Sequence, residues 1–125
     1  DSELSFPSSD FQKIIRDMVN IGDVIDITSY SKTLKLTCKG DFASQETVMH
    51  ETEEEGTISF NHENNTENIV QGSFSLKYLI LFTKCTNLCN LINIFLKNDY
   101  PLIIQYNVAQ LGTIKLCLAP NIEDN

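Results

Sequence analysis

The stretch of sequence that decides the fold is residues 74–84, which read Phe74-Ser75-Leu76-Lys77-Tyr78-Leu79-Ile80-Leu81-Phe82-Thr83-Lys84. Its apolar content predicts a helix over residues 75–86 that packs one side against a core. Lys77 and Lys84 lie seven residues apart, so both project from the same side of that helix. A helix laid against a phosphate backbone needs this arrangement of cations, so the two lysines are candidates for contact with nucleic acid.

A second amphipathic segment lies near the start of the chain, at residues 8–20. Its apolar side chains recur at helical spacing; they are Phe11, Ile14, Ile15 and Met18. Residues 7–10 suit an N-cap and Gly22 suits a helix stop, so the sequence predicts a helix between them. The other side of this helix carries Lys13 and Arg16, whose positive charges lie together three residues apart.

The rest of the chain consists of short β-rich segments bounded by turn signals. We predict strands at residues 24–28, 34–39, 47–50, 57–60 and 69–74, and after the second helix at 91–97, 101–108 and 113–118. Residues 51–56 are acidic and residues 61–68 are rich in asparagine, so both are predicted to be surface loops, because such groups are costly to bury. The pattern predicts an α+β fold, with both helices packed on one face of curved antiparallel sheets.

The length of the chain, 125 residues, is that of one domain, so we expect residues 1–125 to form a single domain. The sequence has no apolar run near the roughly 20 residues that a membrane span needs, and no secretion signal at its start. We therefore expect the chain to be soluble, to have no membrane partner and to be a piece of a longer protein.

The charge of the chain is unevenly distributed. Nine Lys and Arg against seventeen Asp and Glu give a formal net charge of -8, which by itself argues against nucleic acid as a partner. However, residues 44–67 hold seven carboxylates and no Lys or Arg, whereas residues 68–118 hold four lysines and one aspartate. An acidic protein with a basic face can still bind DNA on that face.

The cysteines and histidines do not form a recognisable metal site or catalytic centre. The four cysteines lack the paired short spacings of a zinc module; they are Cys38, Cys85, Cys89 and Cys117. We expect reduced, mostly buried thiols in a reducing compartment. His50 falls in a predicted edge strand and His62 in a polar loop, without a recognisable nucleophile partner. We therefore expect no enzymatic activity, no cofactor and no bound metal.

The order and spacing of several short motifs resemble the C-terminal domain of proliferating cell nuclear antigen, the sliding clamp of eukaryotes and archaea. The motifs are Phe11, Arg16-Asp17, residues 21–23, Leu34-Lys35-Leu36 with Gly40-Asp41, residues 76–84, Pro101-Leu102, Tyr106, residues 118–120 and residues 122–124. The resemblance covers nearly the whole chain. It implies a DNA-clamp domain, the C-terminal half of a subunit whose N-terminal half is absent from this chain, and a homotrimeric ring around duplex DNA when the protein is full length.

The resemblance also implies which residues face the DNA. Lys13, Arg16, Lys77 and Lys84 occupy the basic positions that line the hole of the ring. Lysine and arginine contact phosphates without reading bases, so such a ring can slide. Ile80 stands on the same side, where the family often has a polar residue.

A partner site is a further implication of the resemblance. It is a hydrophobic pocket for the peptide motifs of DNA polymerase and other replication and repair proteins, which insert a helical turn with aliphatic and aromatic anchors. The bordering residues are Pro101, Cys117, Leu118, Ala119, Pro120 and Ile122. Cys117 replaces a frequent aromatic residue of the family, so we expect a pocket with smaller walls.

The segment at residues 46–50 aligns with the edge strand that contacts the neighbouring subunit, through Thr47, Val48, Met49 and His50. Without its N-terminal half, we expect the chain to be monomeric or to pair artificially with itself. Ser31 aligns with a lysine that carries ubiquitin in many eukaryotic clamps, and Lys32 is its neighbour.

The resemblance predicts a DNA polymerase processivity factor that acts in the nucleus and is served by a clamp loader. One alternative is a subunit of a specialised clamp-like ring, such as the heterotrimeric checkpoint clamp. Another is an interaction scaffold that does not bind DNA. The complete ending at residues 118–124 favours the processivity clamp.

Overall fold

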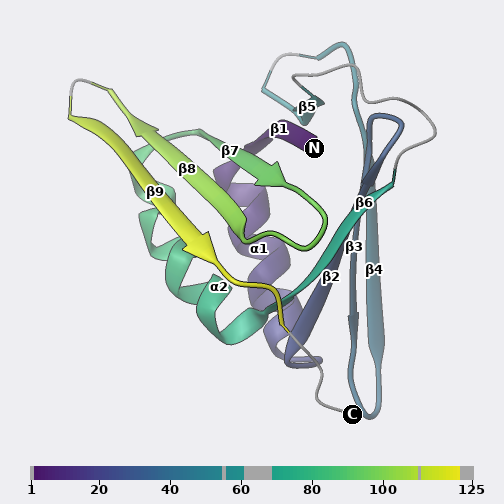
Figure 1. The fold of residues 1–125 in the computed structure, drawn as a ribbon. Helices are drawn as coiled ribbons and strands as arrows, with labels where there is room; N and C mark the ends of the chain where they lie inside the picture. Colours follow the sequence, from purple (N-terminus) through teal and green to yellow (C-terminus); the bar gives the residue numbers. More distant parts are fainter. Residues whose placement is uncertain (1, 55, 61–68, 110, 122–125) are drawn as a thin grey trace.

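The computed structural model shows two α-helices and two antiparallel sheets in the part of the chain that it describes (Figure 1). The described residues are 2–54, 56–60, 69–109 and 111–121. In chain order the elements are β1 (Ser2–Pro7), α1 (Ser8–Val19), β2 (Val24–Tyr30), β3 (Thr33–Lys39), β4 (Ser44–His50), β5 (Ser59–Phe60), β6 (Val70–Ser75), α2 (Leu76–Phe82), the 3-10 helix η1 (Thr83–Leu88), β7 (Leu91–Leu96), β8 (Leu102–Val108) and β9 (Gly112–Leu118). The predicted α+β fold is confirmed.

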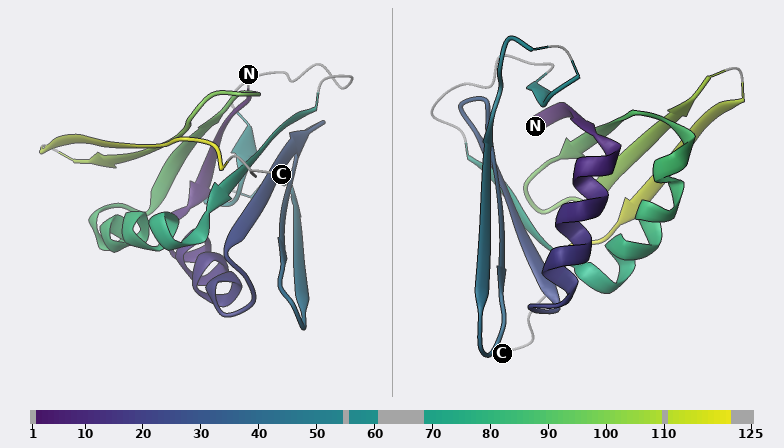
Figure 2. Two further views of the ribbon diagram at one scale, coloured as in Figure 1. Left: turned by 60° about the horizontal axis from the view of Figure 1, so that its bottom comes forward. Right: turned by 180° about the vertical axis from the view of Figure 1, so that it is seen from behind.

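The strands form a five-stranded sheet in the order β5-β1-β7-β8-β9 and a four-stranded sheet in the order β4-β3-β2-β6. Neighbouring strands in both sheets run antiparallel. The chain crosses from one sheet to the other several times, which ties the two sheets around one core. Figure 2 shows that both helices lie against one face of the five-stranded sheet, with the four-stranded sheet beside them.

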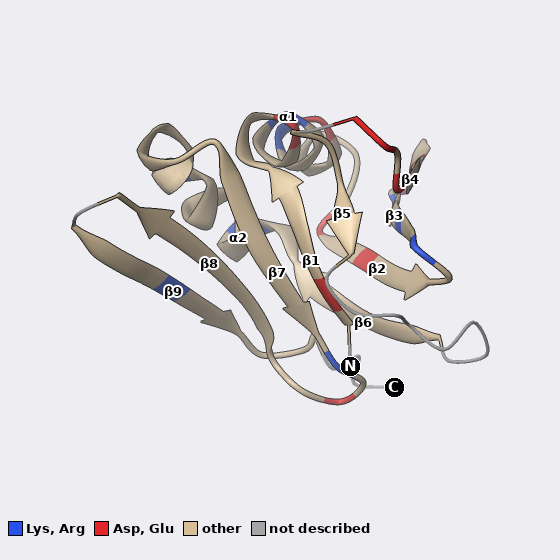
Figure 3. Ribbon diagram, turned by 90° about the horizontal axis from the view of Figure 1, so that it is seen from above, with Lys and Arg blue, Asp and Glu red and all other residues tan. Residues whose placement is uncertain are grey.

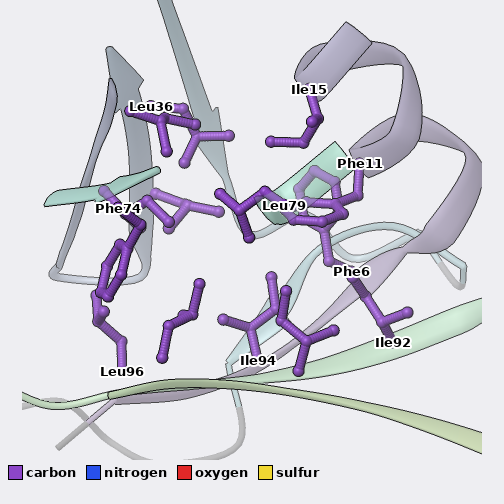
Figure 4. Packing of buried hydrophobic residues seen from close by; sticks show 14 of the residues in the cluster. Phe6, Phe11, Ile15, Leu36, Phe74, Leu79, Ile92, Ile94 and Leu96 are labelled. Carbon is purple, nitrogen blue, oxygen red and sulfur yellow. The ribbon is translucent and has the colours of Figure 1, made fainter. Parts of the chain in front are cut away.

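The core lies between the helices and the inward faces of the two sheets, as the close view shows (Figure 4). Phe11 and Ile15 of α1 and Leu79 of α2 are at most 2% exposed, which confirms the predicted apolar sides of both helices. The rings of Phe6 and Phe11 meet edge to face, with centroids 6.2 Å apart. Burying a side chain of this size stabilises the fold by roughly 1.5–3 kcal/mol, so these contacts hold the helices on the sheet.

The structure contains one strand that was not predicted. β1 directly precedes α1 and pairs with β7 along its whole length. Leu4 and Phe6 alternate into the core, but the serines and Pro7 beside them are more typical of a helix cap than of a strand. β1 lies between β5 and β7 in the five-stranded sheet, and its pairing with β7 places the start of α1 beside the end of η1.

α2 is shorter than the predicted helix, because the chain changes to 3-10 geometry at Thr83. The hydroxyl of Thr83 donates to the carbonyl of Ile80 at 2.7 Å, and that of Thr86 donates to the carbonyl of Thr83 at 2.6 Å. Such bonds compete for the carbonyls that a further α-helical turn would use. The buried hydroxyl of Tyr106 donates to the carbonyl of Phe82 at 3.1 Å, which fixes the junction between α2 and η1.

Candidate nucleic-acid and partner interfaces

The exposed side of α1 carries both of its basic residues. Lys13 and Arg16 are exposed, and the side-chain amide of Asn20 donates to the carbonyl of Arg16 at 3.3 Å near the end of the helix. Asp10 and Asp17 are exposed on the same helix. Figure 3 shows acidic and basic residues together on α1. The formal charges of these four side chains cancel, so positive potential on α1 is confined to the surroundings of Lys13 and Arg16.

Lys77 and Lys84 are both exposed, but no continuous α-helix joins them. Lys77 lies in the first turn of α2 and Lys84 lies in η1. The prediction of one α-helix over residues 75–86 is wrong, because the α-helix ends at Phe82 and a 3-10 helix follows. A 3-10 turn holds about 3.0 residues and an α-helical turn about 3.6, so a separation of seven residues no longer places Lys77 and Lys84 on the same side. Leu81, four residues after Lys77, is 50% exposed, whereas Ile80 packs partly against the core. The apolar residue on this exposed side is therefore Leu81 and not Ile80.

Side-chain bonds fix α1 against η1. The amide of Gln12 donates to the carbonyl of Thr83 at 3.3 Å, and the buried hydroxyl of Ser8 donates to the carbonyl of Cys89 at 2.6 Å. Figures 1 and 2 show α1 and α2 side by side on the same face of the five-stranded sheet. The basic residues predicted to face DNA thus stand on α1, on α2 and on the adjoining η1, and all four are exposed.

Three outward-facing side chains form a row across β7, β8 and β9 on the other face of the five-stranded sheet. Phe95 lies opposite Ile103, and Ile103 lies opposite Cys117. Ile94 and Ile104, next to them in sequence, point into the core, so the row faces away from it. The row forms part of an open cavity of about 400 Å³. The residues that line the cavity are Ser2, Glu3, Phe95, Leu96, Lys97, Tyr100, Pro101, Ile103 and Cys117.

Two of the residues predicted to border a partner pocket, Pro101 and Cys117, line this cavity together. Three others follow Cys117 in the chain but do not line the cavity; they are Leu118, Ala119 and Pro120. Ile122 lies outside the described residues. Of the residues named for a partner pocket, the described part of the structure thus brings Pro101 and Cys117 to one cavity, and their role in binding a partner stays a prediction.

The cavity has further walls that were not predicted, above all Phe95, Ile103 and Tyr100. A signal for the first two exists in the sequence, because residues 91–96 and 102–106 are apolar at positions on both faces of their strands. A strand in an antiparallel sheet that is apolar on both faces has an apolar surface to cover on each side. The outward-facing apolar residues of these two strands, Phe95 and Ile103, line the cavity.

The turn between β7 and β8 forms one wall of the cavity. Asp99 adopts a left-handed conformation with φ of 67°, and the N–H of Tyr100 donates to the carbonyl of Lys97 at 3.2 Å. The ammonium of Lys97 lies 4.3 Å from the centre of the Tyr100 ring, within the range of a cation–π contact. Tyr100 remains 54% exposed. The turn therefore presents an ordered aromatic ring at the mouth of the cavity.

The predicted contact with a neighbouring subunit falls on an edge strand. β4 is last in the order of the four-stranded sheet, and β9 is last in the order of the five-stranded sheet. In β4, Val48 and His50 are exposed, whereas Thr47 and Met49 are half-buried and Met49 packs partly against the core. The ring of His50 shares a hydrogen bond of 3.0 Å with Thr33 of β3. Of the two apolar side chains predicted for this contact, only Val48 faces outward.

The β2–β3 turn holds the lysine next to the position of the family's modified residue. Ser31 and Lys32 take left-handed conformations, with φ of 46° and 58°, and both are exposed. The ammonium of Lys32 lies 3.5 Å from a carboxylate oxygen of Glu51. Modification of Lys32 stays a prediction.

The cysteines in the structure are free thiols in different environments. Burial raises the pKa of the Cys38 and Cys89 thiols, so both are protonated at neutral pH, whereas Cys117 is exposed. Among the described residues, no three His, Cys, Asp or Glu side chains gather as a metal site would require. In the same part of the chain, no helix is long and apolar enough to cross a bilayer. His62 lies outside the described residues.

Comparisons with known proteins agree with the resemblance seen in the motifs. Residues 1–121 match the family described as proliferating cell nuclear antigen, C-terminal domain. A relative from Paramecium bursaria Chlorella virus 1, named probable DNA polymerase sliding clamp 1, is 36% identical over 124 residues, which is 96% of this chain and 45% of the relative. The chain thus spans less than half the length of that relative. Because the family match extends over nearly the whole sequence, the chain belongs to the family of the C-terminal domain of proliferating cell nuclear antigen.

Proposed function

We propose that the chain is the C-terminal domain of a DNA polymerase processivity factor, a sliding clamp that encircles duplex DNA and docks replication and repair proteins. The observation that supports this proposal most is that the two faces of the five-stranded sheet carry different kinds of surface. The helices with their exposed basic residues cover one face, and the apolar cavity opens on the other. A clamp must hold DNA and a partner protein at the same time, and this arrangement keeps the two contacts apart.

The basic residues suit a contact that slides. Lys13, Arg16, Lys77 and Lys84 can approach phosphates, and contacts to phosphates carry no sequence information. Exposed carboxylates on α1 weaken the attraction, and the net charge of -8 discourages binding of DNA elsewhere on the domain. A weak contact that is independent of sequence allows movement along the duplex, which a processivity factor requires. We assign the protein no catalytic activity.

The cavity suits a short apolar peptide. Phe95, Ile103 and Pro101 supply apolar walls, and a small residue, Cys117, leaves room between them. Aliphatic and aromatic anchors on one face of a helical turn bind to such surfaces. We infer that DNA polymerase and other replication proteins dock here through segments of this kind.

Within the described residues, β4 has a partner strand on one side only, which supports assembly into a ring. An unpaired edge can add a strand from a neighbouring subunit, and a head-to-tail contact of this kind closes into a ring when the rotation allows it. We infer a homotrimer of two-domain subunits, opened by a clamp loader and acting in the nucleus during replication and repair. The name of the viral relative, a DNA polymerase sliding clamp, supports the replication role.

Charge reversal on the helices tests the proposal in the full-length protein. Lys13, Arg16, Lys77 and Lys84 are replaced by glutamate, and a control protein has Lys39 and Lys115, which lie outside the helices, replaced instead. The four-residue variant is expected to lose stimulation of DNA synthesis by a polymerase while it still binds a labelled partner peptide. Stimulation that survives in a folded variant would show that these residues do not face DNA, and a scaffold without DNA binding would take the place of the clamp.

A further inference from the structure

The outer edge of β6 holds one segment that carries cavity residues, the β7–β8 turn, and a second that directly follows a cavity strand, the chain after β9. β6 ends the order of the four-stranded sheet, with β2 on its other side. The β7–β8 turn, which carries Tyr100 and Pro101, reaches this edge from the other sheet. The chain that follows β9, the strand of Cys117, reaches the same edge farther along. The turn and the chain after β9 do not pair with β6 as strands, so each is held there by a few individual hydrogen bonds.

The turn is attached to β6 by the side-chain amide of Asn98. Its Oδ1 accepts a hydrogen bond from the N–H of Gln71 at 2.8 Å, and its Nδ2 donates to the carbonyl of Ile69 at 3.2 Å. A primary amide offers the same donor and acceptor as a peptide unit. Asn98 therefore pairs with the edge of β6 as one residue of a neighbouring strand would.

The chain after β9 is attached to the next outward-facing position of the same edge. The N–H of Asn121 donates to the carbonyl of Ser73 at 2.7 Å. Alternate residues of a strand direct their backbone groups to the same edge, so Ile69, Gln71 and Ser73 form one continuous row. The two attachment points are thus two residues apart on a strand whose other edge is paired with β2.

We propose that the edge of β6 is a template that orders the mouth of the cavity before a partner binds, and that Asn98 is a positioning residue for Tyr100. This inference rests on the proposed function, in which the cavity takes an apolar helical turn from a partner protein. Asn98 stands only two residues before Tyr100, with the left-handed Asp99 between them, so fixing Asn98 on β6 restricts where the Tyr100 ring can lie. A wall that is ordered in advance loses less conformational entropy on binding, which increases affinity.

The test measures binding of a fluorescein-labelled synthetic peptide to the full-length protein by fluorescence anisotropy. The peptide has aliphatic and aromatic anchors spaced to share one face of a helical turn. Asn98→Ala is expected to weaken binding about fivefold to tenfold, since hydrogen bonds of this kind contribute on that scale. Asn98→Asp keeps the acceptor for Gln71 but sets a carboxylate against the carbonyl of Ile69, so it is expected to weaken binding at least as much. Asn87→Ala, an exposed site on η1, is the matched control and is expected to bind as the wild type does.

A double-mutant cycle separates positioning from loss of stability. If Asn98 acts by orienting Tyr100, adding Asn98→Ala to Tyr100→Ala changes the affinity by less than about twofold. If Asn98→Ala lowers the affinity equally with and without the Tyr100 ring, the positioning role is refuted. It is also refuted if Asn98→Ala binds the peptide as the wild type does while Tyr100→Ala binds poorly. Failure of the wild type itself to bind the peptide would overturn the proposed function together with this inference. Thermal unfolding of each variant shows that the comparison is made between folded proteins.

Discussion

The hydroxyl of Tyr106 is expected to stabilise the junction between α2 and η1, and Tyr106→Phe tests this. The side chain is 0% exposed, and its hydroxyl donates to the carbonyl of Phe82 at 3.1 Å. The substitution removes this donor and leaves the carbonyl without it. A hydrogen bond contributes about 0.5–1.5 kcal/mol net, and an unsatisfied buried group costs about 1–3 kcal/mol. We therefore expect the free energy of unfolding at neutral pH to fall by roughly 1–2 kcal/mol.

The effect of this substitution is expected to reverse at alkaline pH. Burial raises the pKa of Tyr106 from 10.0 to about 12. As the pH rises, the unfolded chain loses this proton first, so it binds fewer protons than the folded chain and stability falls. The stability that the buried, protonated hydroxyl of Tyr106 contributes is fully present below about pH 10 and is lost as the pH passes about 12. A pKa difference of about two corresponds to roughly 2.7 kcal/mol, so the wild type is expected to lose about that much more stability than Tyr106→Phe over this range.

Urea unfolding followed by circular dichroism, repeated from about pH 8 to about pH 12, measures both effects. Tyr78→Phe is the control, because it removes a hydroxyl from a tyrosine of α2 that is 51% exposed. The control is expected to follow the wild type at every pH. If the difference between wild type and Tyr106→Phe is absent at neutral pH, the hydroxyl does not stabilise the junction, and if it stays constant up to the highest pH, burial does not raise the pKa of Tyr106.

Three further outcomes follow from the structure. Gly72→Ala places a Cβ atom 2.8 Å from the ring of Phe74, so thermal unfolding should show a loss of about 1–3 kcal/mol; an unchanged melting temperature would contradict the close packing. Iodoacetamide at neutral pH should modify the exposed Cys117 well before Cys38, whose pKa is raised by burial, and a bound partner peptide should protect Cys117; mass spectrometry that finds Cys38 modified first would contradict this assignment. For the full-length protein, Lys77→Ala should reduce the slope of log affinity for DNA against log salt by about 1, and an unaltered slope would remove Lys77 from the DNA contact.

The helix α1 could be predicted from sequence because all the information for it is local. Its apolar residues repeat at helical spacing, and the signals at both ends lie within a few residues of the helix. β1 could not be predicted in the same way, because only Leu4 and Phe6 mark its inward face and its pairing partner, β7, is far away in the chain. The early start of β4 likewise depends on its ladder with β3, since the side chains of Ser44 and Gln45 are polar.

The same difference between local signals and long-range contacts decides how much of the candidate sites could be predicted. The exposure of Lys13 and Arg16 follows from helical spacing, and Lys77 and Lys84 are exposed as well, although they lie in different helices, α2 and η1. The change from α2 to η1 has local contacts at Thr83 and Thr86, but Tyr106, which fixes the junction, lies 24 residues from Phe82 in the chain. The row of Phe95, Ile103 and Cys117 depends on the register of three strands, which no local pattern reveals. The sequence therefore points to two lining residues of the cavity, Pro101 and Cys117, but does not define its other walls.

The solution mass of the full-length protein shows whether this domain belongs to a ring-forming clamp. Light scattering on a size-exclusion column measures that mass without reference to shape. We expect the mass of three subunits, each containing two domains of this kind. A stable monomer, or a ring that forms only with other subunits, would contradict the account and favour a specialised clamp-like assembly.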